Sequence, residues 1–407
     1  MKVCAGRFLK GDKKNQLIVL YIIFGMSLFF LVYPYLIYPL LLKVLTAGSG
    51  KSALFENKSN DTPAVTLIIS AYNEAQFIGE KLQNAVSLEY PAEKLEIMVI
   101  SDASDDGTDN IVREWSRRDP RIQLLRQNER LGKTAGLNTG VQQAKGEIVV
   151  FSDANAMYHP RALQELVRYF ENPNIGYVVG AALYNQNDEN AATQSEGLYW
   201  KFELMLKKME SKFHSVVGGD GAIYAIRKTL YWNLDQDDIN DFANPLQIIS
   251  RGYRGIFNPA AICYEDAASD FRKEYRRKRR IVNRSWRAVT KYLSWFNWRK
   301  QFKFLFELFS HKIIRWFSLP IYLLFFFSNL LIIFRTDALF FKFTFAAQLV
   351  IFIFAWLGFL LDSQGKDIPK LIYLPYYYFL VNIAGFLGIY DQFRGIKHTT
   401  WNHVRGN

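Results

Sequence analysis

The sequence predicts an α/β domain, built on a mostly parallel β-sheet with helices on both faces, that lies between membrane segments. Three observations lead to this prediction. Short β-rich runs alternate with helical patterns from residue 64 to residue 153. Apolar residues make up 50% of the 407-residue chain and gather at 17–45 and 313–393. The region between these two stretches has the composition of a soluble protein.

Four runs in the alternating region are expected to be strands. They are "VTLIIS" (65–70), "LEIMVIS" (95–101), "RIQLLRQ" (121–127) and "EIVVFSD" (147–153). Helical spacing is found between them at 74–88, 108–118 and 132–146. Thr108 or Asp109 is expected to cap the second helix, and Gly146 is expected to end the third. A sheet of this kind binds its ligands outside the carboxyl ends of its strands.

Two of these strands deliver acidic residues at that edge. The fourth ends in "FSDAN", in which Asp153 and Asn155 stand one residue apart. Carboxylate and amide oxygens suit Mg²⁺ or Mn²⁺, and such an ion neutralises charge on a departing diphosphate. The same pattern is also typical of a turn or a helix N-cap. The second strand ends at Asp102, which can accept a hydrogen bond from a base N–H or form an Asx-turn.

Two further side chains are candidates for the same site. Lys133 begins a predicted helix at this edge, where a cation suits a phosphate, although an ordinary surface lysine has the same pattern. Asp241 in "DDINDFANP" is the candidate base that takes a proton from an acceptor hydroxyl. The other acids of this cluster are alternatives to it and otherwise solvated loop residues: Asp235, Asp237 and Asp238.

The apolar stretches are long enough to cross a bilayer. The first, 17–45, exceeds the ~20 residues that a hydrocarbon core requires, and its prolines predict a kink, a break or a hairpin. Three further blocks lie at 313–334, 338–361 and 371–390, and the aromatic stretch 292–317 favours an interfacial helix. The net charge of +12 comes from Lys and Arg beside these segments, which is typical of a cytoplasmic membrane surface. No nucleic-acid-binding module is recognised, so nucleic acid is not an expected partner.

Seven motifs occur in order and together resemble the membrane-bound glycosyltransferases of family 2, including cellulose, hyaluronan and poly-N-acetylglucosamine synthases. They are "VTLIISAYNEAQFIGEKL", "VISDASDDGTDN", "RLGKTAGLNTG", "FSDANA", "GGDGAIYAIRK", "INDFANPLQIISRGYR" and "YRRKRRI". The resemblance covers roughly residues 65–285. It implies a GT-A fold, a uridine-diphospho-sugar-type donor, a divalent metal ion and inversion at the transferred sugar.

The resemblance also implies roles for single residues. The nucleotide-sugar site would contain Ala71, Tyr72, Glu74, Asp102, Lys133, Asp153 and Arg280. Asp102 would face the base, and Asp153 and Asn155 would hold Mg²⁺ or Mn²⁺. Asp241 would be the catalytic base, and the acceptor side would be lined by Gly219, Asp220 and Gly221.

The chain departs from the family pattern at three places. Asn155 replaces an aspartate, which predicts weaker metal binding, and Asn240 replaces the glutamate of a Glu-Asp pair. The Gln-x-x-Arg-Trp motif of processive synthases is best matched by 277–281, where Arg280 keeps the cation but Gln and Trp are absent. This argues against processivity, whereas the tail "TTWNHVRGN" (399–407) resembles that of some polysaccharide synthases and argues for it.

The predicted organisation follows the chain. It consists of a basic N-terminal tail (1–16), a transmembrane segment (17–45), a linker (46–63), the GT-A domain (64–268), basic and interfacial helices (269–312), a transmembrane region (313–393) and a C-terminal tail (394–407). The predicted function is inverting transfer of a sugar from a nucleoside-diphosphate donor to a growing polysaccharide, with possible coupling to export. A lipid-linked acceptor that receives one sugar is the alternative, and a non-catalytic nucleotide-sugar-binding scaffold is the alternative of another class.

The expected location is a bacterial inner membrane, with the catalytic domain in the cytoplasm where such donors are made. A single N-terminal crossing would then leave the basic N-terminus outside, against the positive-inside tendency. A hairpin in the first segment and an interfacial position for one later block would remove this conflict.

Overall fold

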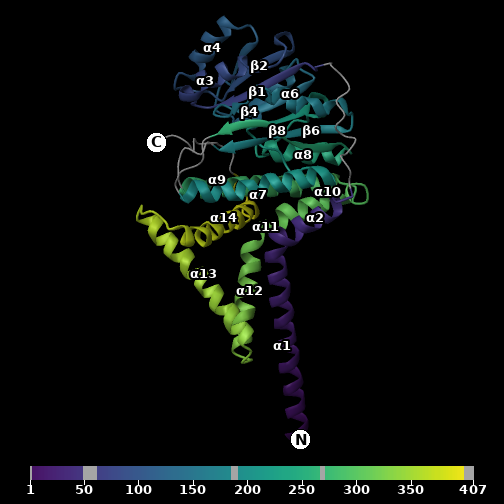
Figure 1. Ribbon diagram of the computed structural model, residues 1–407, viewed down its shortest axis with the longest axis vertical. Helices are drawn as coiled ribbons and strands as arrows, with labels where there is room; N and C mark the ends of the chain where they lie inside the picture. The colour runs from purple at the N-terminus through teal and green to yellow at the C-terminus, as the bar shows by residue number, and fades with distance from the viewer. Residues whose placement is uncertain (1, 49–61, 185–190, 266–270, 398–407) are drawn as a thin grey trace. The chain divides into compact units, whose positions relative to one another are not determined.

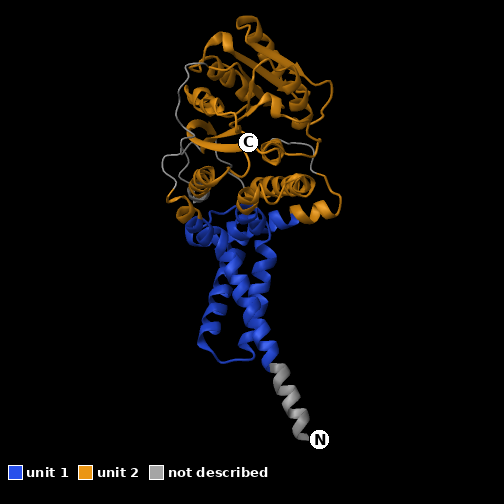
Figure 2. Cartoon of the chain, turned by 90° about the vertical axis from the view of Figure 1, so that its right-hand side faces the viewer, with its two compact units in different colours: residues 1–41, 309–387 blue, residues 42–308, 388–407 orange. Residues whose placement is uncertain are grey.

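The computed structural model describes residues 2–48, 62–184, 191–265 and 271–397. The chain forms two compact units, which Figure 2 distinguishes by colour. Unit 1 comprises Met1–Leu41 and Phe309–Leu387, and unit 2 comprises Leu42–Leu308 and Gly388–Asn407. The predicted tail motif at 399–407 and most of the predicted linker at 46–63 lie outside the described residues.

Unit 2 is built on one eight-stranded sheet (Figure 1). Its strands are β1 (Val65–Ala71), β2 (Leu95–Ser101), β3 (Ile122–Arg126), β4 (Ile148–Asp153), β5 (Met157–Tyr158), β6 (Ile175–Tyr184), β7 (Tyr224–Arg227) and β8 (Arg254–Glu265). The order is β3-β2-β1-β4-β7-β6-β8-β5. The first four strands of that order are parallel, β7 is antiparallel to both of its neighbours, and β6 and β8 are parallel. The prediction of a mixed, mostly parallel sheet is confirmed.

The parallel register brings the predicted site residues to one edge. Ala71 pairs with Ser101, and Ser70 pairs with Asp153, so β1, β2 and β4 end at the same level. Asp102 follows directly after β2, and its backbone N–H donates to the carbonyl of Ala71 at 3.0 Å. Asp102 and Asp153 therefore flank the carboxyl end of β1.

Helices cover both faces of this sheet. They are α3 (Ala75–Val86), α4 (Thr108–Arg118), α5 (Lys133–Gln143), α6 (Ala162–Val167), α7 (Ala191–Phe213), α8 (Asn240–Ser250), α9 (Phe271–Tyr292) and α10 (Phe302–Leu308). Leu67 and Ile69 of β1 pack into the same core cluster as Ile78 and Leu82 of α3. Ile68 points to the other face, because successive strand residues alternate, and α5 packs there on β1 and β2.

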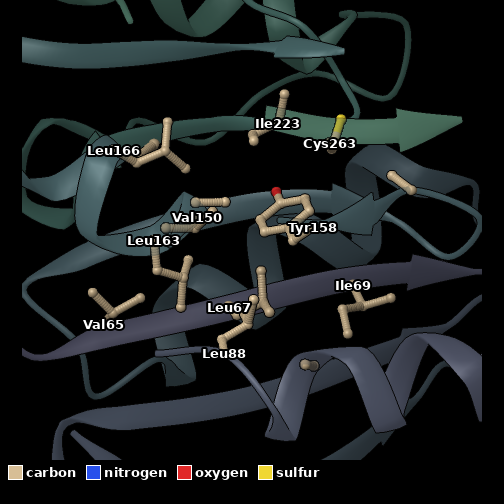
Figure 3. Packing of buried hydrophobic residues seen from close by; sticks show 14 of the residues in the cluster. Val65, Leu67, Ile69, Leu88, Val150, Tyr158, Leu163, Leu166, Ile223 and Cys263 are labelled. Atoms are coloured by element: carbon tan, nitrogen blue, oxygen red, sulfur yellow. The ribbon is translucent and has the colours of Figure 1, made fainter. Parts of the chain in front are cut away.

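Figure 3 shows the centre of this core, where Tyr158 lies among aliphatic side chains and Cys263. The core combines strand residues with helix residues, such as Leu163 and Leu166 of α6. Burial of each large apolar side chain contributes about 1.5–3 kcal/mol relative to exposure. This rigid core fixes the positions of the strand ends.

Two predicted helix ends are wrong. The N-cap of α4 is Gly107, with a φ of 99°, and not Thr108 or Asp109. Asp106 Oδ1 accepts a hydrogen bond from the Thr108 N–H at 3.0 Å and satisfies that free donor. Helix α5 ends at Gln143 and not at Gly146. Gly146 instead lies against β1, and a side-chain carbon there would be 2.4 Å from the Thr66 nitrogen.

Gly255 of β8 has no room for a side chain. A side-chain carbon there would lie 1.9 Å from Cζ of Tyr177, whose ring crosses β8 and whose hydroxyl donates to the Val216 carbonyl. Gly255→Ala is therefore expected to lower the free energy of unfolding by about 1–3 kcal/mol through overpacking. Denaturant melts of the full chain in detergent would measure the change.

The matched control is Gly79→Ala in α3, where the added carbon meets only Ile111 at 3.9 Å. This substitution is expected to be neutral or to stabilise by up to about 1 kcal/mol, because alanine favours a helix over glycine. Equal stability of the two variants would contradict the packing at Gly255.

Unit 1 is helical. Helix α1 (Lys2–Val32) leads through a π-helical turn, η1 (Tyr33–Ile37), into α2 (Tyr38–Thr46), so the predicted N-terminal tail at 1–16 is largely helical. The later elements are η7 (Phe309–Ile313), α11 (Ile314–Trp316), α12 (Ser318–Ile333), α13 (Leu339–Ser363) and α14 (Lys370–Phe393), the last of which extends into unit 2. Within unit 1, α1 packs against α12, where the Phe24 and Phe325 ring centroids are 4.8 Å apart.

Three helices in the described part of the chain are long and apolar enough to cross a membrane: Lys14–Thr46, Leu339–Ser363 and Lys370–Phe393. A fourth span results if the pair Phe302–Trp316 and Ser318–Ile333, bent by 62°, counts as one broken segment. The first segment is helical from end to end, so the predicted hairpin is not found there. Pro34 lies in the π-helical turn, and Pro39 is the second residue of α2.

Candidate active site

Lys133 and Asp153 form a close ion pair at the carboxyl edge of the sheet. Asp153 is the last residue of β4, and Lys133 is the first residue of α5. Lys133 Nζ lies 2.5 Å from Asp153 Oδ1, and both side chains are only about one-fifth to one-quarter exposed, at 19% and 25%. Partial burial keeps this pair less screened than a surface ion pair.

Gly221 marks the space in which three predicted residues meet. A side-chain carbon at Gly221 would lie 3.4 Å from Asp241 Oδ2, 3.7 Å from Asp153 Oδ2 and 3.8 Å from Lys133 Nζ. These three side chains come from α8, β4 and α5, which are far apart in the sequence. The three polar groups therefore gather around one backbone position, Gly221.

The loop before Gly221 is tied to the start of α8. The Gly219 N–H donates to the Asp241 carbonyl, and a side-chain carbon at Gly219 would lie 2.8 Å from that oxygen. Asp220 accepts a hydrogen bond from Lys207 of α7 at 3.2 Å, and both side chains are largely buried. The predicted acceptor residues therefore lie next to the candidate base.

The environment of Asp241 favours a proton acceptor. Burial raises the pKa of its carboxyl group above the ordinary range, and the nearby Lys133 ammonium opposes this rise. The carboxylates of Asp220 and Asp153 raise the pKa further. A carboxylate with a raised pKa is a stronger base once ionised, as general base catalysis requires.

The pH dependence of transfer is expected to report this environment. The base works only when ionised, so kcat/KM should rise with pH through the raised pKa of Asp241. Asp220→Asn removes a like charge, lowers the pKa of Asp241 and should move this acid limb to lower pH. Asp119→Asn, at the opposite end of the sheet, is the control, and an unmoved limb in Asp220→Asn would contradict the coupling.

Asp102 holds the loop that leads to Lys133. Its Oδ1 accepts hydrogen bonds from Gln127 Nε2 at 2.7 Å and from the N–H groups of Leu131 at 2.9 Å and Gly132 at 3.0 Å. The side chain is buried, with 7% exposed. The predicted contact with a base stays a prediction, and the structure adds a positioning role that the sequence did not reveal.

The predicted nucleotide residues Ala71, Tyr72 and Glu74 continue from the end of β1. Ala71 is buried, and the Tyr72 ring lies under the Arg130 guanidinium, whose carbon is 3.9 Å from the ring centroid. Glu74 is also buried, at 2% exposed, and its N–H donates to Thr108 Oγ1 at 2.8 Å. Of these three residues, Tyr72 offers a partly exposed aromatic surface at this edge, whereas Ala71 and Glu74 shape the turn.

The turns after β1 and β2 are strained. Asn73 and Ala103 adopt positive φ values of 54° and 59°. Asn73 Nδ2 donates to Asp105 at 2.8 Å, and its Oδ1 accepts from the Asp105 N–H at 3.1 Å. Left-handed conformations in residues other than glycine tend to occur at functional sites. Asparagine tolerates this conformation best, so the "YNE" triplet contained a readable signal.

Arg280 and Arg284 lie one turn apart on α9. Burial and the neighbouring Arg277 lower the pKa of Arg280, whereas the carboxylates of Asp153 and Asp241 raise it. Arg280 is therefore within electrostatic reach of both acids. Arg284, which sequence reasoning missed, is buried and donates to Thr134 Oγ1 at 3.0 Å and to the Asp237 carbonyl at 3.1 Å. Its spacing of four residues from Arg280 was the available signal.

Asn240, which stands where the family has glutamate, has a structural partner. Its Nδ2 donates to the Tyr224 hydroxyl at 2.8 Å, and Asn244 donates to the same oxygen at 3.0 Å. All three side chains are buried. The amide pair therefore anchors the first turn of α8, which carries Asp241, to β7.

The residues at the end of β4 fit a divalent ion that is shared with a phosphate. Asp153 Oδ2 lies beside Gly221, and the half-buried Asn155 is two residues further on. Within the described part of the chain, no group of three or more His, Cys, Asp and Glu side chains gathers as a metal site. Mg²⁺ and similar ions commonly use one or two carboxylates and complete their shell with substrate phosphates and water.

Residues 66–235 match the family model described as Glycosyl transferase family 2. The chain carries a family 2 glycosyltransferase domain. The glycosyltransferase domain contains the ends of β1, β2 and β4, with Lys133, Asp153 and Gly221, whereas Asp241 and Arg280 follow it.

Two curated relatives show the range of this family. A beta-monoglucosyldiacylglycerol synthase of Synechocystis is 30% identical over 164 residues, which cover 40% of this chain and 33% of that protein. A poly-beta-1,6-N-acetyl-D-glucosamine synthase of Staphylococcus aureus is 26% identical over 211 residues, which cover 50% of each chain. The chain spans from 33% to 61% of the length of such relatives.

A solved structure has the same fold over most of the chain. It is the mannosyltransferase PcManGT from Pyrobaculum calidifontis in complex with GDP-Man and Mn²⁺. The TM-score is 0.68 at 23% sequence identity, and the match covers 90% of this chain and 98% of that one. The predicted GT-A fold is confirmed.

Proposed function

We propose that this chain is an inverting membrane glycosyltransferase that transfers a sugar from a nucleoside-diphosphate donor, of the UDP-sugar type, to a growing polysaccharide. Asp241, Asp153 and Lys133 converge around Gly221, and this convergence is the main support for the proposal. A base, an acidic metal ligand and a phosphate-binding cation are the groups that this transfer needs in one place. The family 2 match and the poly-beta-1,6-N-acetyl-D-glucosamine synthase relative support it.

In the proposed mechanism, Asp241 takes the proton of an acceptor hydroxyl as its oxygen attacks the anomeric carbon of the donor sugar. Attack from the side opposite the diphosphate inverts that carbon. Lys133 and Arg280 stabilise the negative charge that develops on the departing diphosphate. Asp153 and Asn155 would hold Mg²⁺ or Mn²⁺, which supplies further charge neutralisation when bound.

The tyrosine at the end of β1 is proposed to bind the nucleobase. The Tyr72 ring, with Arg130 on one face, provides an aromatic surface at the carboxyl edge of the sheet. Asp102 is proposed to orient the loop before Lys133 and to contact the base. The 214–221 loop, through Gly219 and Asp220, is proposed to line the acceptor side.

The apolar helices support a membrane location with the glycosyltransferase domain in the cytoplasm, where nucleotide sugars are made. Basic residues of α9 precede the later apolar segments, which agrees with a cytoplasmic surface that carries anionic lipids. A polysaccharide made at such a surface would need a route across the membrane, so coupling to export is part of the proposal.

The alternative acceptor is a lipid-linked one that receives a single sugar. It is supported by the relative named beta-monoglucosyldiacylglycerol synthase and by the missing Gln and Trp around Arg280.

The test uses the purified full chain in lipid nanodiscs with a panel of radiolabelled UDP- and GDP-sugars, with Mn²⁺ or Mg²⁺. Sizing of the products distinguishes the acceptors, because a polymer or ladder supports the polysaccharide and a single lipid-extractable product supports the alternative. Donor binding without turnover of any sugar would contradict an enzyme and leave the scaffold function.

A further inference from the structure

Lys81 is a lysine in the core of the glycosyltransferase domain that the proposed mechanism does not use. It lies on α3, and its side chain has 0% exposure. Lysine is almost never fully buried unless it is paired. Its ammonium donates to a backbone carbonyl and not to a carboxylate. Burial lowers the pKa of Lys81 to about 7, which reflects this unfavourable position for a cation.

The Lys81 ammonium is directed at the turn that carries the metal ligands. Lys81 Nζ donates to the carbonyl of Ala156, which is fully buried. The Ala156 N–H donates to the Asp153 carbonyl at 3.3 Å and closes a four-residue turn. Asp153 and Asn155 are the first and third residues of that turn. Lys81 therefore binds the carbonyl of the last residue of this turn.

Tyr158 connects this contact to the rest of the site. Lys81 Nζ lies 4.1 Å from the centroid of the Tyr158 ring, within cation–π distance. The Tyr158 hydroxyl donates to either of two carbonyls at 3.1 Å, those of Phe151 in β4 and Ala222. Ala222 follows Gly221 directly. Lys81 and Tyr158 thus join the metal turn to the loop that faces Asp241.

The charge of Lys81 also acts on the site. Cys263, the Asp153 carboxylate and Glu265 raise the pKa of Lys81 against the larger effect of burial. The positive charge of Lys81 and the Asp153 carboxylate therefore attract each other. An isosteric apolar residue would pack in the same space without the penalty of a buried charge.

We propose that Lys81 is a positioning residue that holds the 153–156 turn in the geometry that binds the divalent ion. This inference rests on the proposed function, since it assumes that Asp153 and Asn155 bind Mg²⁺ or Mn²⁺. Groups behind the ligands of a metal commonly change its affinity by about 10–100-fold when they are replaced. Loss of the Lys81 contact releases the turn and removes a charge near Asp153. The affinity of the site for the metal ion is therefore expected to fall.

The test compares Mn²⁺ binding with folding in the full chain. Mn²⁺ is titrated with UDP and, separately, with GDP, and free Mn²⁺ is measured by electron paramagnetic resonance. Lys81→Met is expected to weaken Mn²⁺ binding by about tenfold or more and to raise the Mn²⁺ concentration for half-maximal transfer to a similar extent. Lys81→Gln keeps an N–H donor without the charge and is expected to give a smaller loss.

The matched control is Asn84→Ala, three residues further along α3. Asn84 makes two hydrogen bonds of 2.8 Å to the backbone of Tyr158, beyond the metal turn. This variant should lower the melting temperature, with Mn²⁺ affinity within about twofold of the wild type because the turn itself is still held. Lys81→Met is expected to do the reverse: it weakens Mn²⁺ binding without lowering the melting temperature.

Unchanged Mn²⁺ affinity in Lys81→Met, with transfer by the wild type intact, would overturn this inference alone. If Lys81→Met fails to fold, Lys81→Gln decides, and wild-type affinity in that variant overturns the inference. A wild-type chain that neither binds Mn²⁺ nor transfers sugar would overturn the proposed function as well.

Discussion

Replacing Asp241 by asparagine is expected to lower kcat by about 10²–10⁴-fold, the contribution that a positioned general base commonly makes. The substitution keeps the size of the side chain and removes its ability to accept a proton. Asp241 Oδ2 lies beside Gly221, close to Asp153 and Lys133, and burial raises the pKa of this carboxyl group. Single-turnover measurements with the donor found by the screen would report the chemical step directly.

Binding of the donor should survive the Asp241→Asn substitution, because Asp153, Lys133 and Arg280 remain. The dissociation constant of the nucleoside diphosphate is therefore expected to change by less than about threefold. Asp235→Asn is the matched control, since Asp235 lies in the same acidic loop but is 55% exposed and pairs with Lys291 at 2.8 Å. Exposed pairs of this kind contribute little, about 0–1 kcal/mol. A kcat of Asp241→Asn within tenfold of the Asp235→Asn value would exclude Asp241 as the base.

The second large effect is expected at Asp153. Asp153→Asn removes the carboxylate that Lys133 contacts at 2.5 Å and the charged member of the metal turn. Electrostatic groups at a departing charge are commonly worth about 10²–10³-fold in rate, so kcat/KM should fall by that amount. Mn²⁺ binding should weaken in the same variant, because the charge of its ligands strongly affects the affinity of a hard cation.

A substitution at Asn155 is expected to change Mn²⁺ binding in the opposite direction. Asn155→Asp restores a second carboxylate in the turn and is expected to strengthen Mn²⁺ binding, for the same reason of ligand charge. Isothermal titration of Mn²⁺ in the presence of nucleoside diphosphate would measure both variants. Equal Mn²⁺ affinity in the wild type, Asp153→Asn and Asn155→Asp would show that this turn does not hold the ion.

Local patterns were sufficient for the sheet and its carboxyl edge. The four predicted strands are β1 to β4, with ends within one residue of those expected, because buried parallel strands appear as short apolar runs between helical repeats. Asp102 and Asp153 were assigned to one edge because parallel strands end together. The helix ends were less accurate, since the cap of α4 uses Gly107 and Asp106 in a turn that propensity alone did not reveal.

The resemblance to family 2 named the site residues, but their contacts required the structure. Lys133 pairs with Asp153, and Asp102 holds the loop before Lys133, contacts that span 20 and about 30 residues. The side chain of Asn240, which looked like a lost catalytic acid, anchors α8 to Tyr224. Arg284 appeared only as another basic residue of α9, because its carbonyl partners belong to the distant 236–238 loop.

The sequence by itself determined which segments become strands and helices, which are apolar enough to span a membrane, and which acids and cations stand at strand ends. These properties depend on spacing and composition over a few residues. The tertiary structure decided that Asp241 meets Asp153 at Gly221 and that Lys81 supports the metal turn from the core. Such contacts join residues 75 or more positions apart, and they arise from packing of the whole domain, which no local pattern encodes.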